Sequence, residues 1–242
     1  MSVLHPASDF SGNHNVFKNE STGTLTVVAQ LYLYGSVASD DLAQRIAYNV
    51  ERVWDRPEII LSLDEQDFLI RFQVTGIYID DPRPLLTKNR DYKKLFFRIE
   101  TETDNPLGGI SYMDGRNSNT GFLRLDNVAF DGSTTEAHEV GHGWGLVPGT
   151  PDGHPLDLNL IGKGQPGIMY PRGTLVDPQY QWNPSARPGE FGGTLKPDKR
   201  IVTMEDIAML GLDQLDYDWQ GRARLGGLTN VYHEGKSPFP LA

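Results

Sequence analysis

The chain reads TTEAHEVGH over residues 134–142, and this stretch decides the fold and the chemistry that we expect. If the stretch is helical, His138 and His142 lie one turn apart on the same face, with side-chain roots about 5–6 Å apart. Two imidazoles at that spacing can ligate one Zn²⁺ at about 2.0–2.1 Å each. Glu139 follows the first ligand directly, so its carboxylate can reach a water on the metal without ligating the metal. The motif therefore predicts a zinc site in which Glu139 is the general base.

The flanking residues predict where this helix begins and ends. Ser133 is followed three residues later by Glu136, which is the pattern of a capping box, so the helix is expected to begin there. Gly143 and Gly145 weaken the helix just after His142. The chain can then turn back and bring in a further ligand.

The third ligand has to come from a later segment, because a catalytic zinc takes three protein ligands and an open water position. His154 is the first candidate, since it lies in the turn-rich loop GTPDGHP at residues 149–155. Asp152 is the second candidate and Asp157 the third. An exposed helix that carries two histidines and a glutamate by chance is the alternative to a metal site.

The composition narrows the classes of partner. The 242 residues carry a net charge of −10, which argues against nucleic acid, because phosphate binding needs clustered Lys and Arg. The simplest interpretation of the negative net charge is that it keeps the protein soluble. The alternative interpretation is that it gives the protein a mild preference for cationic peptides. The chain has no cysteine, which removes disulfides, cysteine zinc ligands and thiol nucleophiles. No apolar run approaches the roughly 20 residues that span a bilayer, so no membrane partner is expected.

The first residues, Met1 to Pro6, lack the basic and apolar regions of a secretory signal. If the protein is exported or secreted, as we expect, its export does not use a recognisable signal peptide in this chain. A cytoplasmic protein is the alternative.

The order of apolar patterns predicts an α+β fold. Ser39 is expected to cap a helix that stops before Pro57, and Thr203 is expected to cap a final helix over Met204 to Leu212. The sequence predicts one strand before the first of these helices and several strands between that helix and the helix around residue 138. This order indicates a mixed, twisted sheet with a backing helix and an active-site helix. The expected strands are Leu25–Tyr34, Phe68–Ile79, Leu95–Ile99 and Phe122–Leu125, with a short apolar run at residues 59–61.

Three segments follow from this order. Residues 1–22 are polar and are expected to form an irregular N-terminal arm, with a loose terminus favoured over a pro-segment across the cleft. Residues 23–145 form an upper catalytic subdomain that ends in the zinc-binding helix. Residues 146–242, rich in Gly and Pro up to about residue 200, form a smaller irregular lower subdomain with the third ligand and the C-terminal helix.

Two motifs carry a resemblance to a known family. His138-Glu139-x-x-His142-x-x-Gly145, followed by GIMYP at residues 167–171, resembles the metzincin zinc metallopeptidases, including uncharacterised bacterial metzincin-like proteins. The metzincin pattern is H-E-x-x-H-x-x-G-x-x-H/D, with a later methionine in a tight turn beneath the metal. The resemblance implies zinc ligation by the two histidines, Glu139 as the base, a bend at Gly145 and Met169 as the turn methionine. It covers roughly residues 110–212.

The chain departs from the metzincin pattern at two places. Pro148 stands where the family has its third ligand, which implies an insertion that displaces the ligand to His154, with Asp152 as the alternative. Tyr170 follows Met169 directly, whereas family members with a zinc-switching tyrosine carry it two residues after the methionine. Tyr170 is therefore a possible transition-state stabiliser, and a structural role in the core or wall is the favoured alternative.

The resemblance also implies a substrate and a reaction. Ile110–Met113 would be the edge strand of the cleft, along which an extended peptide or protein substrate pairs. The predicted function is a zinc-dependent endopeptidase, in which a zinc-activated water attacks the peptide bond and Glu139 acts as general base. One alternative is a non-catalytic metal-binding or adhesion module on a degenerate peptidase fold. Another is a gluzincin-like peptidase with Glu190 or Glu205 as the third ligand.

A second metal is possible by composition alone. The loop from Asp114 to Asn119 offers oxygen ligands of the kind that Ca²⁺ prefers. It has no EF-hand spacing, so nothing in the sequence supports a calcium site. The sequence also says nothing of the cleavage preference or the oligomeric state.

Overall fold

The structure is a computed structural model that describes residues 10–56, 58–63, 65–102, 110–130 and 132–234. The strand β2 (Thr24–Tyr34) lies at the centre of its fold. Leu25, Val27, Ala29, Leu31 and Leu33 are at most 1% exposed. Because successive side chains of a strand point to opposite faces, this alternation gives the sheet one apolar face. The expected strand Leu25–Tyr34 is therefore present and begins one residue earlier.

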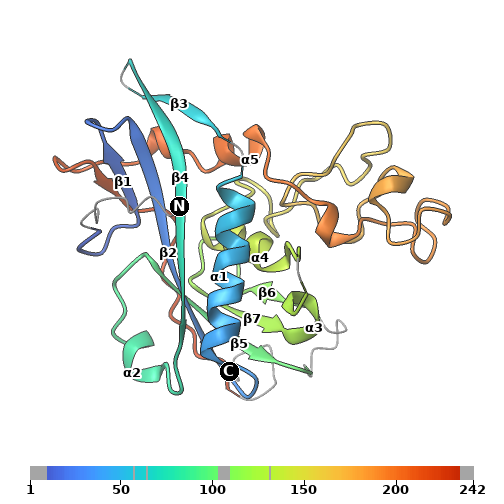
Figure 1. Ribbon diagram of the computed structural model, residues 1–242, viewed down its shortest axis with the longest axis horizontal. Helices are drawn as coiled ribbons and strands as arrows, with labels where there is room; N and C mark the ends of the chain where they lie inside the picture. Colours follow the sequence, from blue (N-terminus) through green and yellow to red (C-terminus); the bar gives the residue numbers. More distant parts are fainter. Residues whose placement is uncertain (1–9, 57, 64, 103–109, 131, 235–242) are drawn as a thin grey trace, which may run out of the picture.

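A curled, mixed sheet is assembled around this strand (Figure 1). On one edge of β2, β4 (Gln66–Tyr78) pairs in parallel over residues 24–33. The other edge is shared by two strands. There β1 (Val16–Asn19) pairs antiparallel with the first half of β2, and β5 (Lys94–Glu100) pairs in parallel with the second half.

The remaining strands extend the sheet on both sides. β3 (Ile60–Leu63) forms an antiparallel pair with β4, and β7 (Thr120–Arg124) lies parallel to β5. β6 (Tyr112–Met113) pairs antiparallel with β7 and ends the order β3-β4-β2-β5-β7-β6. β8 (Arg222–Ala223) pairs with β1. In the described part of the chain, β6 is thus an edge strand.

Helix α1 (Asp40–Trp54) backs the sheet and runs alongside β4 in Figure 1. It begins where expected, because the Ser39 hydroxyl accepts a hydrogen bond from the Leu42 amide at 3.2 Å. Its apolar residues recur at helical spacing and are buried against the strands. At its C-terminal end the Trp54 indole donates to the Ala137 carbonyl at 3.0 Å, which joins α1 to α4 (Thr135–Gly143).

The other α-helices in the described ranges are short. They are α2 (Arg83–Leu86), α3 (Leu125–Val128) and α5 (Met204–Met209). Thr203 caps α5 as expected, in a capping box with Asp206. The helix ends three residues before the expected end at Leu212, because Gly211 takes a left-handed conformation (φ 60°) and a 3₁₀ turn, Leu212–Gln214, follows. Over the described ranges, no helix combines the length and apolarity that a membrane crossing requires.

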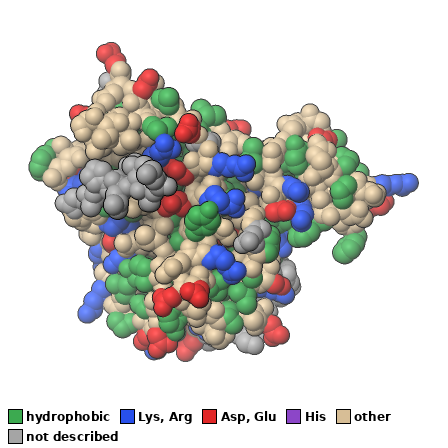
Figure 2. Space-filling view, viewed as in Figure 1, with side chains coloured by type: hydrophobic (Ala, Val, Ile, Leu, Met, Phe, Trp, Pro, Cys, Tyr) green, Lys and Arg blue, Asp and Glu red, His purple; other side chains and the backbone are tan. Residues whose placement is uncertain are grey.

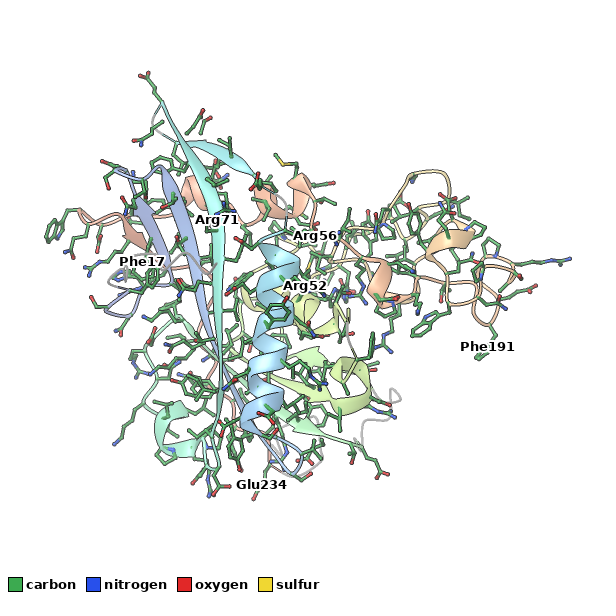
Figure 3. The ribbon with its side chains drawn as sticks, in the orientation of Figure 1. Phe17, Arg52, Arg56, Arg71, Phe191 and Glu234 are labelled. Atoms are coloured by element: carbon green, nitrogen blue, oxygen red, sulfur yellow. The ribbon has the colours of Figure 1, made fainter. Side chains whose placement is uncertain are left out.

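Residues 146–200 form the irregular lobe that their Gly and Pro content predicts. It contains two 3₁₀ turns, Pro178–Tyr180 and Pro197–Lys199, and a small apolar cluster of Leu160, Val176 and Leu195. The lobe projects from the body of the molecule at the right of Figures 1 and 2. Phe191 lies near its far end and points away from it (Figure 3).

Two segments expected to be irregular contribute strands. Residues 16–19 of the expected arm form β1, and residues 222–223 of the expected irregular lower subdomain form β8 beside it. β8 depends on pairing with β1 from the other end of the chain, which local composition does not reveal. β1 also pairs with the adjacent β2 across a short turn. The part of the arm over residues 1–9 lies outside the described residues.

Two further expectations about boundaries are wrong. The expected edge strand Ile110–Met113 is a strand only at residues 112–113. The capping box at Ser133 does not form, since Thr134 is the N-cap of α4 and makes no side-chain capping bond. The Ser133 hydroxyl instead donates to the Glu136 carboxylate at 2.6 Å, which joins two buried side chains.

Candidate metal centre

Helix α4 places two histidines and a glutamate in the interior of the molecule. His138, Glu139 and His142 are 5%, 5% and 7% exposed, and every residue of the helix is buried. The helix is enclosed because it packs against α1 on one side and against β6 and β7 on another. The two imidazoles therefore point into a protected space, as the spacing of the motif predicts.

His154 returns from the irregular lobe to complete a cluster with the two helical histidines. Its Nε2 lies 3.2 Å from Nε2 of His138, which in turn lies 3.2 Å from Nε2 of His142. Nitrogens that share a tetrahedral zinc at about 2.0–2.1 Å are about 3.3 Å apart. Within the described ranges, these three form the one group of three or more His, Asp or Glu whose ligand atoms converge in this way. The cluster could hold a metal ion.

The opposite nitrogen of each ring is held by a hydrogen bond. Nδ1 of His138 lies 2.8 Å from the Ile168 carbonyl, and Nδ1 of His142 lies 3.2 Å from the Leu146 carbonyl. Nδ1 of His154 lies 3.1 Å from the Asp152 carboxylate. An acceptor at Nδ1 keeps the proton there and leaves Nε2 with a free lone pair, which is the arrangement around metal-binding histidines.

Burial further favours the neutral, ligating form of the two helical histidines. It lowers the pKa of His142 to about 4, and the neighbouring His154 adds to this effect. Burial, with the positive charge of Arg200, lowers the pKa of His138 well below its usual range. Both rings therefore keep a lone pair for a metal at neutral pH.

Glu139 points toward the same space and is oriented by the edge strand. Its Oε2 accepts a hydrogen bond from the backbone N–H of Met113 in β6 at 2.9 Å. Burial raises the pKa of Glu139 to about 8, opposed by Arg200, the Met113 amide and Arg172. A carboxylate whose pKa lies near neutrality can both take and return a proton.

No protein-family model and no curated protein matches this chain. The chemistry of the site is therefore argued from its own residues. These surround a cavity of about 300 Å³ that contains the histidine cluster and Glu139 at its base. Residues 110–113, including the edge strand, form part of its wall.

The turn that contains Met169 lies directly beneath α4. Met169 is fully buried, and a Cβ placed on Gly141 would come within 2.6 Å of its sulfur. The carbonyl of the preceding residue, Ile168, is the one that holds His138. Met169 thus lies against helix α4, and Gly141 is the residue that allows this close approach. Gly145 forms the expected bend after the helix, with φ 97°.

Asp152 and Asp157, the other candidates for third ligand, lie outside the convergent group. Asp152 is the hydrogen-bond partner of His154 instead. Asp157 forms an exposed ion pair with Lys163 at 2.5 Å. Both carboxylates therefore already have other partners.

Several other residues that the sequence suggested for catalysis or metal binding do not lie next to the three histidines. Tyr170 packs beside the apolar cluster of the irregular lobe and does not line the cavity. Glu190 and Glu205, the possible gluzincin-type ligands, are exposed and lie outside the convergent group. Asp114, from the loop considered for calcium, accepts a hydrogen bond from Thr120 and contacts His233 at 2.9 Å.

Sequence reasoning missed the arginines of the cavity wall, among them Arg172 and Arg200 of the irregular lobe. Arg172 donates to the Asn127 side chain at 2.8 Å. Arg200 is 5% exposed, and its burial lowers its pKa to about 10. The sequence gives no signal for either residue, because both come from the irregular lobe and reach the site only through the fold.

Proposed function

We propose that this chain is a zinc-dependent endopeptidase of the metzincin type. One observation carries the proposal: three imidazoles converge at zinc-like spacing, next to a buried glutamate that does not belong to the group. Imidazole nitrogens suit zinc as well as other transition metals, and an adjacent carboxylic acid suits hydrolysis, for which zinc is a common metal. The order of the motifs along the chain, with Met169 below the histidines, further supports this type of enzyme.

Bound zinc would supply Lewis-acid polarisation of a peptide carbonyl and a lowered pKa for water at the site. The chain's own residues then have separate roles. His138, His142 and His154 would hold the ion, and Asp152 with two backbone carbonyls orients their rings. Residues 110–113, in the cavity wall, offer backbone for an extended substrate.

Glu139 moves the proton. Its Oε2 is engaged by the Met113 amide, so we assign proton transfer to Oε1. Oε1 takes a proton from the attacking water as the carbon–oxygen bond forms. Glu139 then passes this proton to the leaving nitrogen as the carbon–nitrogen bond breaks. Water thereby adds across the amide, and the carboxylate returns to its starting form.

Metal analysis and cleavage assays on Glu139→Gln test this proposal. We expect the wild-type protein to hold one zinc and to cleave casein or unstructured peptides. Glu139→Gln should keep the zinc and lose roughly a hundredfold to ten-thousandfold in kcat/KM, the usual contribution of a general base. Glu58→Gln, a change at an exposed carboxylate, is the matched control.

Two outcomes would contradict the proposal. Full activity in Glu139→Gln would remove its role as the base. A protein that binds zinc stoichiometrically and cleaves no peptide would instead be a non-catalytic metal-binding module.

A further inference from the structure

Arg200 is a buried cation without enough hydrogen-bond acceptors. Its side chain lines the cavity beside His138 and Glu139, yet the residue is only 5% exposed. Within the described parts of the chain, neither its Nε nor its Nη1 has a hydrogen-bond partner. A buried guanidinium that lacks acceptors is costly to the fold, since it has lost water without replacing it.

The position of Arg200 is determined by the start of the zinc-site helix. Arg200 follows directly on the 3₁₀ turn Pro197–Lys199. The hydroxyl of Thr134, the N-cap of α4, donates to the Pro197 carbonyl and ties this turn to the helix. The backbone that carries Arg200 is therefore fixed next to the start of α4.

Arg172 adds a second cation to the same wall, and its orientation is also supported. Its Nη2 donates to Oδ1 of Asn127 at 2.8 Å. The amide of Asn127 donates in turn to the Ser111 hydroxyl at 3.2 Å. Ser111 also lines the cavity, so this chain of bonds connects Arg172 to the segment that precedes the edge strand.

The charges around the cavity are opposite in sign to those of the protein as a whole. The chain carries −10, but the cavity is lined by Arg116, Arg172 and Arg200 against the carboxylates of Glu139 and Asp152. Asp152 is paired with His154, and one oxygen of Glu139 is engaged by a backbone amide. A bound divalent cation would add to the positive charge. A negatively charged ligand group is the missing partner.

We propose that Arg200, together with Arg172, forms a carboxylate-binding subsite, so that the substrate carries a carboxylate next to the bond that is cleaved. A guanidinium donates charge-assisted hydrogen bonds to a carboxylate, which favours a carboxylate over an amide of the same shape. The inference rests on the proposed peptidase function and names its substrate class. The carboxylate is supplied by an acidic side chain or by a free C-terminus.

Matched peptides test the subsite. We would compare the kcat/KM of quenched fluorescent peptides that differ only by Asp, Asn or Lys at each position flanking the cleaved bond. A second set ends in a free acid or an amide, which separates the two sources of the carboxylate. Wild-type protein should prefer Asp over Asn, or the free acid over the amide, by roughly tenfold to a hundredfold.

Variants assign this preference to the arginines. Arg200→Gln should bring the Asp-to-Asn ratio close to one, Arg200→Lys should retain part of it, and Arg172→Gln should reduce it. Arg187→Gln is the control, since Arg187 is an exposed arginine of the same lobe that does not line the cavity. An equal loss for all peptides in Arg200→Gln would overturn the inference, as would a wild-type preference for Lys. If Arg200→Gln does not fold, the inference is tested by the Asp-to-Asn ratio of kcat/KM in the wild type and by the decrease of that ratio in Arg172→Gln.

Binding without turnover separates this inference from the proposed function. The same peptides would be titrated by fluorescence anisotropy into zinc-loaded Glu139→Gln, with and without Arg200→Gln. Tighter binding of the carboxylate peptide that depends on Arg200 supports the subsite even if no peptide is cleaved. Cleavage of all peptides with no carboxylate preference, and no such difference in binding, would leave the peptidase and reject the subsite.

Discussion

Gly141 and Met169 are in close contact: a Cβ at Gly141 would lie 2.6 Å from the methionine sulfur. Gly141 lies within α4, between Glu139 and His142, and the chain just before Met169 holds His138 through the Ile168 carbonyl. The contact therefore connects the helix that presents two histidines to the turn that orients one of them. Helix α4 can approach this turn closely because residue 141 has no side chain.

Gly141→Ala should destabilise the protein, although Ala is favoured over Gly in most helices by about 1 kcal/mol. The added methyl group overpacks the contact with Met169, which costs about 1–3 kcal/mol. Urea unfolding would measure the change. Gly173→Ala is the control, because nothing lies within 4 Å of a Cβ there. Met169→Ala should be less harmful in the Gly141→Ala background than alone, and strictly additive effects would argue against the contact.

Asp152→Ala should weaken zinc binding without abolishing it. Asp152 contacts Nδ1 of His154 and orients that ring, and loss of such a partner costs about tenfold to a hundredfold in metal affinity. His154→Ala should cost more, because it removes a ligand. Competition with a chromogenic chelator would give both affinities, with Asp157→Ala as the control. A larger loss in Asp152→Ala than in His154→Ala would identify Asp152 as the ligand.

Trp54→Phe should lower the free energy of unfolding by about 1–2 kcal/mol, because it weakens the contact between helices α1 and α4. The change removes the hydrogen bond from the buried indole to the Ala137 carbonyl and leaves most of the apolar packing. Trp54→Ala should cost about 3–5 kcal/mol, since it also creates a cavity. Urea unfolding gives both values. Trp219→Phe is the control: Trp219 is 90% exposed, and an equal effect there would contradict the assignment.

Glu136→Gln should flatten the dependence of stability on pH near pH 5. Burial raises the pKa of Glu136 from 4.5 to about 6, against the hydrogen bonds from Ser133 and Asn49. Because the folded state binds the proton more tightly, this carboxyl group favours folding below pH 4.5, and the benefit is lost as the pH rises through 6. The shift corresponds to about 2 kcal/mol.

Unfolding free energies measured from pH 4 to pH 7 in the presence of a chelator would test this. The difference between Glu136→Gln and wild type should change by that amount in favour of the variant as the pH rises. Glu58→Gln should parallel the wild type. A constant difference across the range would show that the Glu136 carboxyl is not perturbed by burial.

The sequence alone determined the elements whose residues interact locally. The spacing of His138 and His142, the caps at Ser39 and Thr203 and the alternation in β2 each depend on residues close in the chain. Their periodicity reports directly which face is buried. The convergence of His154 with the helical histidines was also expected, because the motif requires a third ligand and the following loop offered one.

The tertiary structure decided everything that depends on distant pairing. β8 is a strand because it pairs with β1 from the opposite end of the chain, and no local pattern carries that information, whereas β1 also forms a hairpin with the neighbouring β2. Asp152 contacts His154 and does not join the three converging histidine nitrogens, because the loop brings the imidazole and not the carboxylate to the centre. Arg172 and Arg200 enter the cavity from an irregular lobe without periodicity. A charge buried far from its sequence neighbours can be recognised only once the fold has placed it.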